Sequence, residues 1–184
     1  MIDFLANSTH KNIMSTALPA RPRSAPTHRS RIAIVASLYN EQYTQALVDH
    51  TKEELALILP NTHLDIARVP GAFEIPVACE LLLDGNTPPD AIIALGVIIQ
   101  GQTQHAGMVA ESVTTSLQEM AIRHKKPVIH EVLLVDDEKQ AYARCMASKL
   151  NRGREAARAA HTMIELFQAM TKEKTKKHMG FVKK

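Results

Sequence analysis

The sequence predicts an α/β protein built on a four-stranded parallel β-sheet with helices on both faces. Short apolar runs rich in β-branched residues alternate with longer segments of helical periodicity, and turn-forming residues separate the two kinds of segment. This alternation favours parallel strands, because each helix carries the chain back across one face of the sheet. The 184 residues are enough for one domain of this kind with tails.

The predicted elements follow one another in this alternating order. Strands are expected over four short apolar runs, at 31–37, 62–68, 91–98 and 128–134. Helices are expected over five amphipathic segments, at 41–59, 75–83, 106–123, 137–149 and 153–170. The second strand alternates, which points Leu64 and Ile66 inward. Pro76 lies in the first turn of the second helix, where proline is tolerated, and Asp136-Asp137 occupies the N-cap position of the fourth.

Turn-forming residues separate these elements. The loop Leu38-Tyr39-Asn40 follows the first strand, and Pro60-Asn61 ends the first helix. A turn-rich break at 84–89 precedes the third strand, and Lys125-Lys126-Pro127 precedes the fourth. Asn151-Arg152-Gly153 separates the last two helices. A four-stranded sheet leaves open edges, which favours oligomerisation.

Charge divides the chain into three parts. We predict a flexible basic extension at 1–30, a folded domain at 31–170 and a Lys-rich tail at 171–184. The first 31 residues hold five basic residues against one acidic residue, and the last 14 hold six against one. Between them lie 11 basic and 17 acidic residues, so the folded part is acidic. This distribution argues against a nucleic-acid partner, which would need a basic folded surface.

Targeting signals and cysteine usage point to the cytoplasm. No apolar run reaches the roughly 20 residues of a membrane span, and the N-terminal segment has no continuous apolar core of a secretory signal. That segment loosely resembles a transit peptide, but we interpret it as a disordered extension. Cys79 and Cys145 form no CxxC pair, and we expect two buried free thiols, as is common in a reducing compartment.

Polar stretches follow all four predicted strands, and parallel strands bring them to one edge of the sheet. These stretches are Tyr39-Asn40, Pro70 to Glu74, Gly101 to His105 and Asp136-Asp137. The dinucleotide pattern GxGxxG, the phosphate loop GxxxxGK[ST], the zinc motif HExxH and the serine elbow GxSxG are all absent from the sequence. The combination predicts a site for a planar heterocycle beside a phosphorylated partner, with proton transfer and no cofactor or metal.

Each of these residues also has a purely structural interpretation. Tyr39 could be a core aromatic, and Glu74 could complement a helix dipole. His130 lies on an apolar strand and could be core, while Arg144 could be a surface residue of a helix. The acidic run 136–138 is more typical of a helix cap than of a magnesium site. Four histidines carry no functional signal in the sequence, namely His50, His63, His124 and His161.

Two motifs resemble the signatures of the 6,7-dimethyl-8-ribityllumazine synthase family. The first is Val69-Pro70-Gly71-Ala72-Phe73-Glu74-Ile75-Pro76, and the second runs from Leu95 to His105. Pro127-Val128, Glu138-Lys139-Gln140-Ala141 and Asn151-Arg152-Gly153 recur in family order and spacing, so the resemblance covers 31–170. It implies a three-layer, flavodoxin-like αβα sandwich. It also implies a transferase that condenses 5-amino-6-ribitylaminouracil with 3,4-dihydroxy-2-butanone 4-phosphate, without metal or cofactor, in riboflavin biosynthesis.

The resemblance also implies how the site is built. The family forms pentamers, which in some members pair as decamers or build 60-subunit shells, and its sites lie between neighbouring subunits. Prolines in the N-terminal extension oppose a regular added strand there and favour a pentamer or decamer. His105 corresponds to the acid/base residue. The positions that correspond to substrate-binding residues are Tyr39, Asn40, Ala72, Phe73, Glu74, Val97, Ile98, Ile99, Gln102, Thr103, His130, Arg144 and Arg152.

Several positions depart from the family pattern. Tyr39 stands where Phe or Trp is usual, and His130 stands where Phe is frequent. Gln100 replaces a common Arg, and Arg152 replaces a common Lys. Ala106-Gly107-Met108 replaces an aromatic-acidic-aromatic run after the histidine. These changes leave open an alternative, a divergent paralogue that binds flavin or lumazine, or forms a shell, without catalysis.

Overall fold

The computed structural model describes residues 18–22 and 29–180, and for 173–180 it describes the backbone alone. The strands are β1 (Arg31–Ser37), β2 (His63–Val69), β3 (Ala91–Ile99) and β4 (Val128–Val135). The helices are α1 (Glu41–Ile58), α2 (Ile75–Leu83), α3 (His105–His124), α4 (Glu138–Cys145) and α5 (Arg152–Gly180). A short 3-10 turn, η1 (Ala72–Glu74), precedes α2. The predicted α/β order is therefore confirmed.

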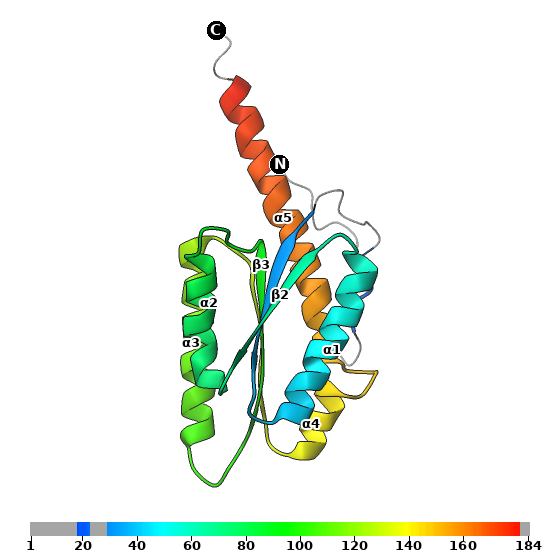
Figure 1. Ribbon diagram of the computed structural model, residues 1–184, viewed down its shortest axis with the longest axis vertical. Helices are drawn as coiled ribbons and strands as arrows, with labels where there is room; N and C mark the ends of the chain where they lie inside the picture. The colour runs from blue at the N-terminus through cyan, green and yellow to red at the C-terminus, as the bar shows by residue number, and fades with distance from the viewer. Residues whose placement is uncertain (1–17, 23–28, 181–184) are drawn as a thin grey trace, which may run out of the picture.

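The four strands form a parallel sheet in the order β2-β1-β3-β4. Helices α2 and α3 cover one face, and α1, α4 and α5 cover the other (Figure 1). The central strands bury side chains on both faces: Ile32 and Ile34 pack toward α1 and α5, and Ala33 and Val35 pack toward α2 and α3. This two-sided burial explains why β1 and β3 appear in the sequence as continuous apolar runs.

Ile66 shares the inward face of β2 with Leu64, as predicted, but its side chain is not buried there. Strand β2 lies at the edge of the sheet, and the Ile66 side chain is 43% exposed, whereas Leu64 packs at the margin of the core. Alternation of apolar and polar residues does not distinguish an edge strand from a central one. At an edge strand the covering helix reaches only part of the inner face.

The last two helices also differ from their predicted bounds. Helix α4 ends at Cys145 rather than at 149, because the buried Asn151 satisfies backbone groups at the break. Its amide donates to the carbonyls of Cys145 (3.0 Å) and Ala147 (3.3 Å), and its Oδ1 accepts from the Arg154 N–H (3.1 Å). Helix α5 continues to Gly180 instead of ending at 170. The added residues are mostly Lys, Glu and Thr without proline, and Lys and Glu favour helix even without apolar periodicity.

Helices α1 and α5 cross closely at Gly153. A Cβ at this position would lie 2.5 Å from the carbonyl oxygen of Leu47 and 3.1 Å from Thr51 Oγ1. The Thr51 hydroxyl lies 2.7 Å from the Leu47 oxygen and 3.0 Å from the Gly153 oxygen, so the contact is both tight and polar. The glycine therefore sets the distance between the two helices.

Replacing Gly153 with Ala is expected to lower the free energy of unfolding by about 1–3 kcal/mol, because the clash is with backbone and the helices must separate. Chemical denaturation measures the effect. Gly107→Ala is the matched control, since a Cβ at that helical glycine meets nothing within 4 Å. Equal stability of the Gly153→Ala variant and the parent would show that the crossing can open without cost.

Part of the predicted N-terminal extension contacts the folded domain. Glu54 of α1 is 1% exposed and pairs with Arg21 (2.8 Å) and with Arg158 of α5 (2.7 Å). Burial alone would raise the pKa of Glu54, but hydrogen bonds from Arg21 and Arg158 outweigh it and lower the pKa. Arg158 also donates to the carbonyl of Pro19. The remaining predictions for the extension, at 1–17 and 23–28, and for 181–184 lie outside the described residues.

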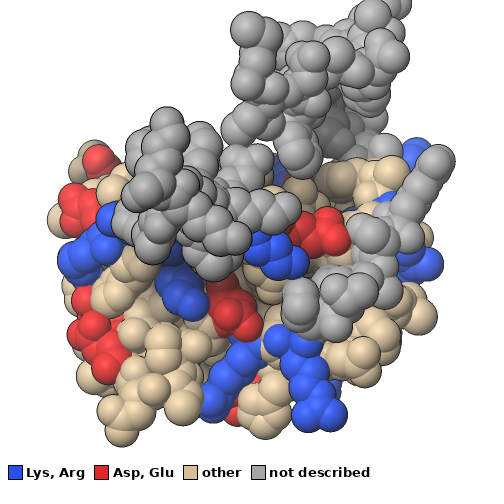
Figure 2. All heavy atoms as spheres, turned by 90° about the horizontal axis from the view of Figure 1, so that it is seen from above, with Lys and Arg blue, Asp and Glu red and all other residues tan. Residues whose placement is uncertain are grey.

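The surface seen from above carries charges of both signs. Lys and Arg are interspersed with Asp and Glu there, and the described residues on this face form no continuous basic patch (Figure 2). Within the described part of the chain, no helix is long and apolar enough to cross a membrane.

Candidate functional site

A cavity of about 510 Å³ opens at the carboxyl edge of the sheet. Strand order reverses between β1 and β3, since the chain passes from β1 outward to β2 and then returns across β1 to β3. Such a switch point is where open α/β sheets bind ligands. The lining residues are Tyr39, Asn40, Gly71, Ala72, Phe73, Glu74, Val97, Ile98, Ile99, Gly101, Thr103, His105, Ala106 and Val109.

Asn40 joins the two strands that flank the switch point. Its backbone adopts the left-handed conformation (φ 54°), which Asn tolerates better than most residues. From there its side-chain amide donates to the carbonyl of Val97 in β3 at 2.7 Å. The neighbouring Tyr39 is held by its N–H, which donates to the Pro70 carbonyl at 3.1 Å, while its ring is 73% exposed at the cavity. An exposed ring at a cavity wall is suited to stacking on a planar ligand.

Gly71 lets the second loop close against this ring. Its N–H donates to Glu74 Oε2 at 2.8 Å, which fixes the carboxylate at the start of α2. A Cβ on Gly71 would lie 3.0 Å from that oxygen and 3.3 Å from Tyr39 Cδ2. A carboxylate has about four acceptor positions, so Glu74 keeps capacity for ligand hydroxyls after binding Gly71.

Replacing Gly71 with Ala is expected to raise KM for a ligand stacked on Tyr39 by about tenfold, the equivalent of about 1.4 kcal/mol. The added methyl would displace both the ring and the carboxylate, while His105 would stay in place. Steady-state kinetics or equilibrium binding measures the change. Gly101→Ala is the control in the same cavity, because its Cβ would meet nothing within 4 Å. Equal effects of the two variants would contradict this role of Gly71.

The third loop leads into the start of α3. His105 is the first residue of this 20-residue helix. The first helical hydrogen bond runs from the Met108 N–H to the carbonyl of the N-cap residue Gln104. The preceding N–H groups lack intrahelical partners and favour an anion, as does the Thr103 hydroxyl at the cavity. Gln100 braces the loop, because its amide donates to the carbonyls of Gly101 (3.3 Å) and Thr103 (3.2 Å).

The lining residues carry few metal-ligating side chains. Glu74 and His105 are the carboxylate and imidazole among them, fewer than the three protein ligands that a catalytic zinc site uses. The lining instead offers an aromatic ring, hydrogen-bonding groups, a helix N-terminus and one titratable ring. This set can bind a heterocycle and a phosphate and can move protons.

Four predicted site residues do not line this cavity. They are Gln102, His130, Arg144 and Arg152. Gln102 is exposed on the loop next to it. The other three lie on the β4 side of the sheet, on β4, α4 and α5. Ten of the predicted residues therefore line one cavity and Gln102 lies next to it, whereas three lie elsewhere in the subunit, on β4, α4 and α5.

His130 has a defined hydrogen-bond partner. The Thr114 hydroxyl lies 2.8 Å from the Ala110 carbonyl oxygen and 2.9 Å from His130 Nε2, so β4 and α3 are joined by hydrogen bonds at this point. Arg144 is half-buried and donates to the Gln140 carbonyl at 3.4 Å.

Arg152 pairs with Glu155 at 2.6 Å next to Glu131. Burial raises the pKa of Glu131 to about 8, with Arg152 opposing the rise and Glu155 adding to it. Burial likewise raises the pKa of the neighbouring Cys145 thiol to about 12. Among the carboxyl groups near the predicted site residues, Glu131 has the most strongly shifted pKa, and its burial was not predicted from the sequence.

Four lining residues are absent from the predicted site residues: Gly71 and Gly101, which belong to the predicted loops, and Ala106 and Val109. Ala106 and Val109 lie in the first turns of α3, and Val109 is four residues after His105, on the same helix face. Helical spacing from the histidine could have identified Val109. Ala106 was noted only as a departure from the family pattern.

Comparison with known proteins is consistent with this site. The family model of 6,7-dimethyl-8-ribityllumazine synthase matches residues 29–168. The chain is 36% identical over 153 residues to 6,7-dimethyl-8-ribityllumazine synthase 1 of Rhizobium meliloti, covering 81% of this chain and 97% of that protein. It is 38% identical over 140 residues to the synthase of Protochlamydia amoebophila, covering 75% and 80%.

A third relative gives the same result. The chain is 33% identical over 147 residues to the 6,7-dimethyl-8-ribityllumazine synthase of Nitrobacter hamburgensis, covering 78% of this chain and 89% of that protein. The matched region contains β1 to β4 and every residue of the cavity lining. The chain therefore belongs to the 6,7-dimethyl-8-ribityllumazine synthase family.

Proposed function

We propose that this protein condenses 5-amino-6-ribitylaminouracil with 3,4-dihydroxy-2-butanone 4-phosphate to 6,7-dimethyl-8-ribityllumazine in riboflavin biosynthesis. The observation that carries the proposal is the cavity at the switch point, where Tyr39, Glu74, Thr103 and His105 meet from three separate loops. Membership of the family supports the identity of the two substrates.

Each lining group has a role in this reaction. The exposed Tyr39 ring stacks on the pyrimidine, and Glu74 with its neighbour Phe73 contacts the ribityl chain. Thr103 and the start of α3 bind the phosphate of the second substrate. His105 is the first residue of α3 and lines the same cavity, where it acts on the reacting atoms of the two substrates.

The chemistry needs proton transfers and a leaving phosphate. The 5-amino nitrogen forms an imine with the ketone and water is lost. The C–O bond to phosphate then breaks, and after tautomerisation the ribitylamino nitrogen closes the ring with loss of a second water. The atoms balance without an oxidant or reductant, so we propose that no cofactor is consumed. His105 accepts and returns the protons in these steps.

We also propose a homo-oligomer based on a pentamer, with each site shared by two subunits. His130 and Arg144 lie on the β4 side, away from their own cavity, and in a head-to-tail ring that side meets the cavity of the next subunit. Phe73, Val77 and Leu81 form an exposed apolar stripe from η1 along α2, which supports burial against another copy. In this arrangement Arg144 binds the phosphate in the site of the neighbouring subunit. We place Arg152 of the same subunit and Gln102 of the neighbouring subunit's loop next to that phosphate.

The first experiment follows lumazine formation. Purified full-length protein is mixed with the two substrates, and the lumazine absorbance is recorded against the uncatalysed condensation. A rate well above that background supports the proposal. Binding of lumazine without turnover would instead identify a non-catalytic paralogue.

The shared site is tested by mixing variants. His105→Ala and Arg144→Ala are co-expressed in equal amounts, and each alone is measured in parallel. If the two residues serve one site from different subunits, about one quarter of the sites in mixed rings regain both residues and activity returns. Absence of recovery in verified mixed oligomers would contradict the shared site. Mass photometry gives the assembly, and we expect a pentamer or decamer of the 20.3 kDa chain rather than a 60-subunit shell.

We further propose a cytoplasmic location. Cys79 and Cys145 are free and buried, and burial raises the pKa of both thiols to about 12. Such thiols are unreactive core residues and need no oxidising compartment.

A further inference from the structure

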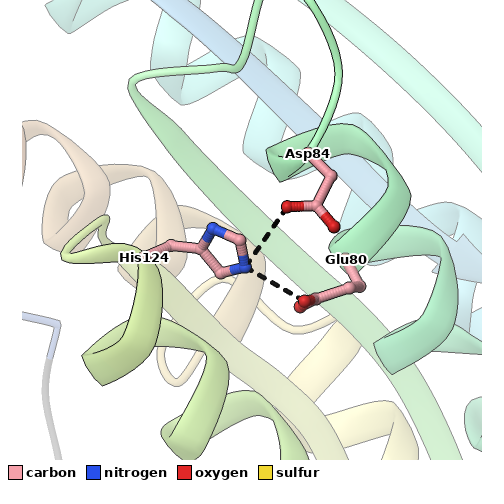
Figure 3. Close-up of side chains that lie close together, drawn as sticks. All are labelled: Glu80, Asp84 and His124. Carbon is pink, nitrogen blue, oxygen red and sulfur yellow. Dashed lines mark hydrogen bonds and ion pairs between the residues drawn. The ribbon is translucent and has the colours of Figure 1, made fainter.

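Three metal-ligating side chains converge at the end of the helical layer remote from the cavity. Glu80 in the last turn of α2, Asp84 directly after it and His124 at the end of α3 point toward one another (Figure 3). Both helices begin beside the cavity and run away from the carboxyl edge, so these residues lie at the opposite end of the layer. None of the three has a role in the proposed reaction.

The distances suit a single ion. His124 Nε2 lies 3.1 Å from Glu80 Oε1 and 3.9 Å from Asp84 Oδ1, and the three ligand atoms all lie within 4.8 Å of one another. Zinc bonds of about 2.0–2.1 Å in a tetrahedron place neighbouring ligands roughly 3.4 Å apart. Small side-chain rotations would therefore bring all three atoms into one coordination sphere.

The local charge also favours a cation. The C-termini of α2 and α3 meet here, and each helix end carries partial negative charge. Glu80 Oε1 already lies 2.6 Å from Arg123 Nη2 and 3.1 Å from His124 Nε2, so this carboxylate faces cationic and polar partners. Its Oε2 is buried and has no hydrogen-bond partner among the described residues. A buried carboxylate oxygen without a partner is costly, and a bound cation would compensate it.

Arg123 is the competing cation. Its Nη2 lies 2.6 Å from Glu80 Oε1, and its side chain is 58% exposed. An exposed guanidinium contributes little to stability and can move into solvent when an ion takes the carboxylate. Arg123 should thus weaken metal binding without preventing it.

We propose that Glu80, Asp84 and His124 form a binding site for a divalent transition-metal cation, with Zn²⁺ as its best occupant. One imidazole and two carboxylates are a zinc-type ligand set, whereas Mg²⁺ and Ca²⁺ prefer oxygen ligands alone. A water completes the tetrahedron. The ion joins α2 to α3 at the end remote from the cavity, so its role is structural and independent of the proposed reaction.

Zinc titration of the untagged full-length protein, followed by calorimetry, tests the site. We expect one saturable Zn²⁺ per chain, which His124→Gln weakens by at least about 100-fold. Removing the competing guanidinium in Arg123→Gln should tighten binding by about tenfold. His63→Gln is the matched control, because His63 also lies 3.1 Å from a carboxylate, Asp65, but has no third ligand in its group.

A second measurement is independent of stability and of activity. Co²⁺ in place of Zn²⁺ should give the intense visible absorption of a tetrahedral site in the parent and in His63→Gln, but not in His124→Gln. The proposal fails if no saturable binding occurs or if His124→Gln binds as the parent does. It also fails if Arg123→Gln weakens binding as much as His124→Gln, because the group would then be an ion-pair network to which Arg123 belongs.

Discussion

Replacing His105 with Ala is expected to lower kcat for lumazine formation by about 100-fold, with little change in either KM. His105, the first residue of α3, is exposed at the cavity, and we propose that it exchanges protons with both substrates there. A positioned acid/base group contributes about 10²–10⁴ in rate, and the lower end applies because the reaction consists of several steps that water can also assist. Steady-state kinetics with each substrate varied in turn separates kcat from KM.

The control for this prediction is His63→Ala on the edge strand β2. His63 is exposed and lies at the start of its strand, at the edge of the sheet opposite the cavity. It should leave kcat unchanged. A His105→Ala variant with parental kcat and a raised KM would show that the ring binds substrate rather than moving protons.

Replacing Glu131 with Gln is expected to stabilise the protein at pH 8–9 and to change little at pH 5. The pKa of Glu131 is raised from 4.5 to about 8 in the folded protein, chiefly by burial. The folded state therefore holds a proton that the unfolded chain releases, and stability is lost as pH rises from about 4.5 to about 8. Each pKa unit corresponds to about 1.4 kcal/mol, and partial solvent contact of the side chain reduces the expected gain to about 2 kcal/mol.

Chemical denaturation of both proteins across pH 5–9 measures this difference. The charged or titratable groups that act on Glu131 are Arg152, Glu155 and Cys145. The parent and the variant both contain these groups, so the difference between their stabilities reports the titration of Glu131 alone. Glu119→Gln, an exposed position on α3, controls for the loss of one negative charge. A constant difference between Glu131→Gln and the parent at all pH values would contradict the raised pKa.

The order of the elements and the position of the site both follow from local sequence patterns. Strands β1 and β3 are buried on both faces of the sheet. Their sequences are therefore continuous apolar runs, which can be recognised without the structure. Because parallel strands end at one edge, the polar stretches after them had to converge, and Tyr39, Glu74 and His105 do line one cavity. The N-cap at Asp137 was equally local, since its carboxylate accepts the Gln140 N–H three residues later at 2.7 Å.

Which side chains from distant segments meet depends instead on the tertiary packing. Periodicity reports which face of its own helix or strand a residue occupies, but not whether a neighbour covers it. Ile66 was therefore correctly predicted to point inward, but its exposure on the edge strand β2 was not predicted. The same limit hid Glu131, whose pKa is raised because β4 packs under α5. His124 and Glu80 lie 44 residues apart and meet because α3 packs against α2. Such contacts depend on how the helices cross the sheet, which is a property of the whole fold and not of any local pattern.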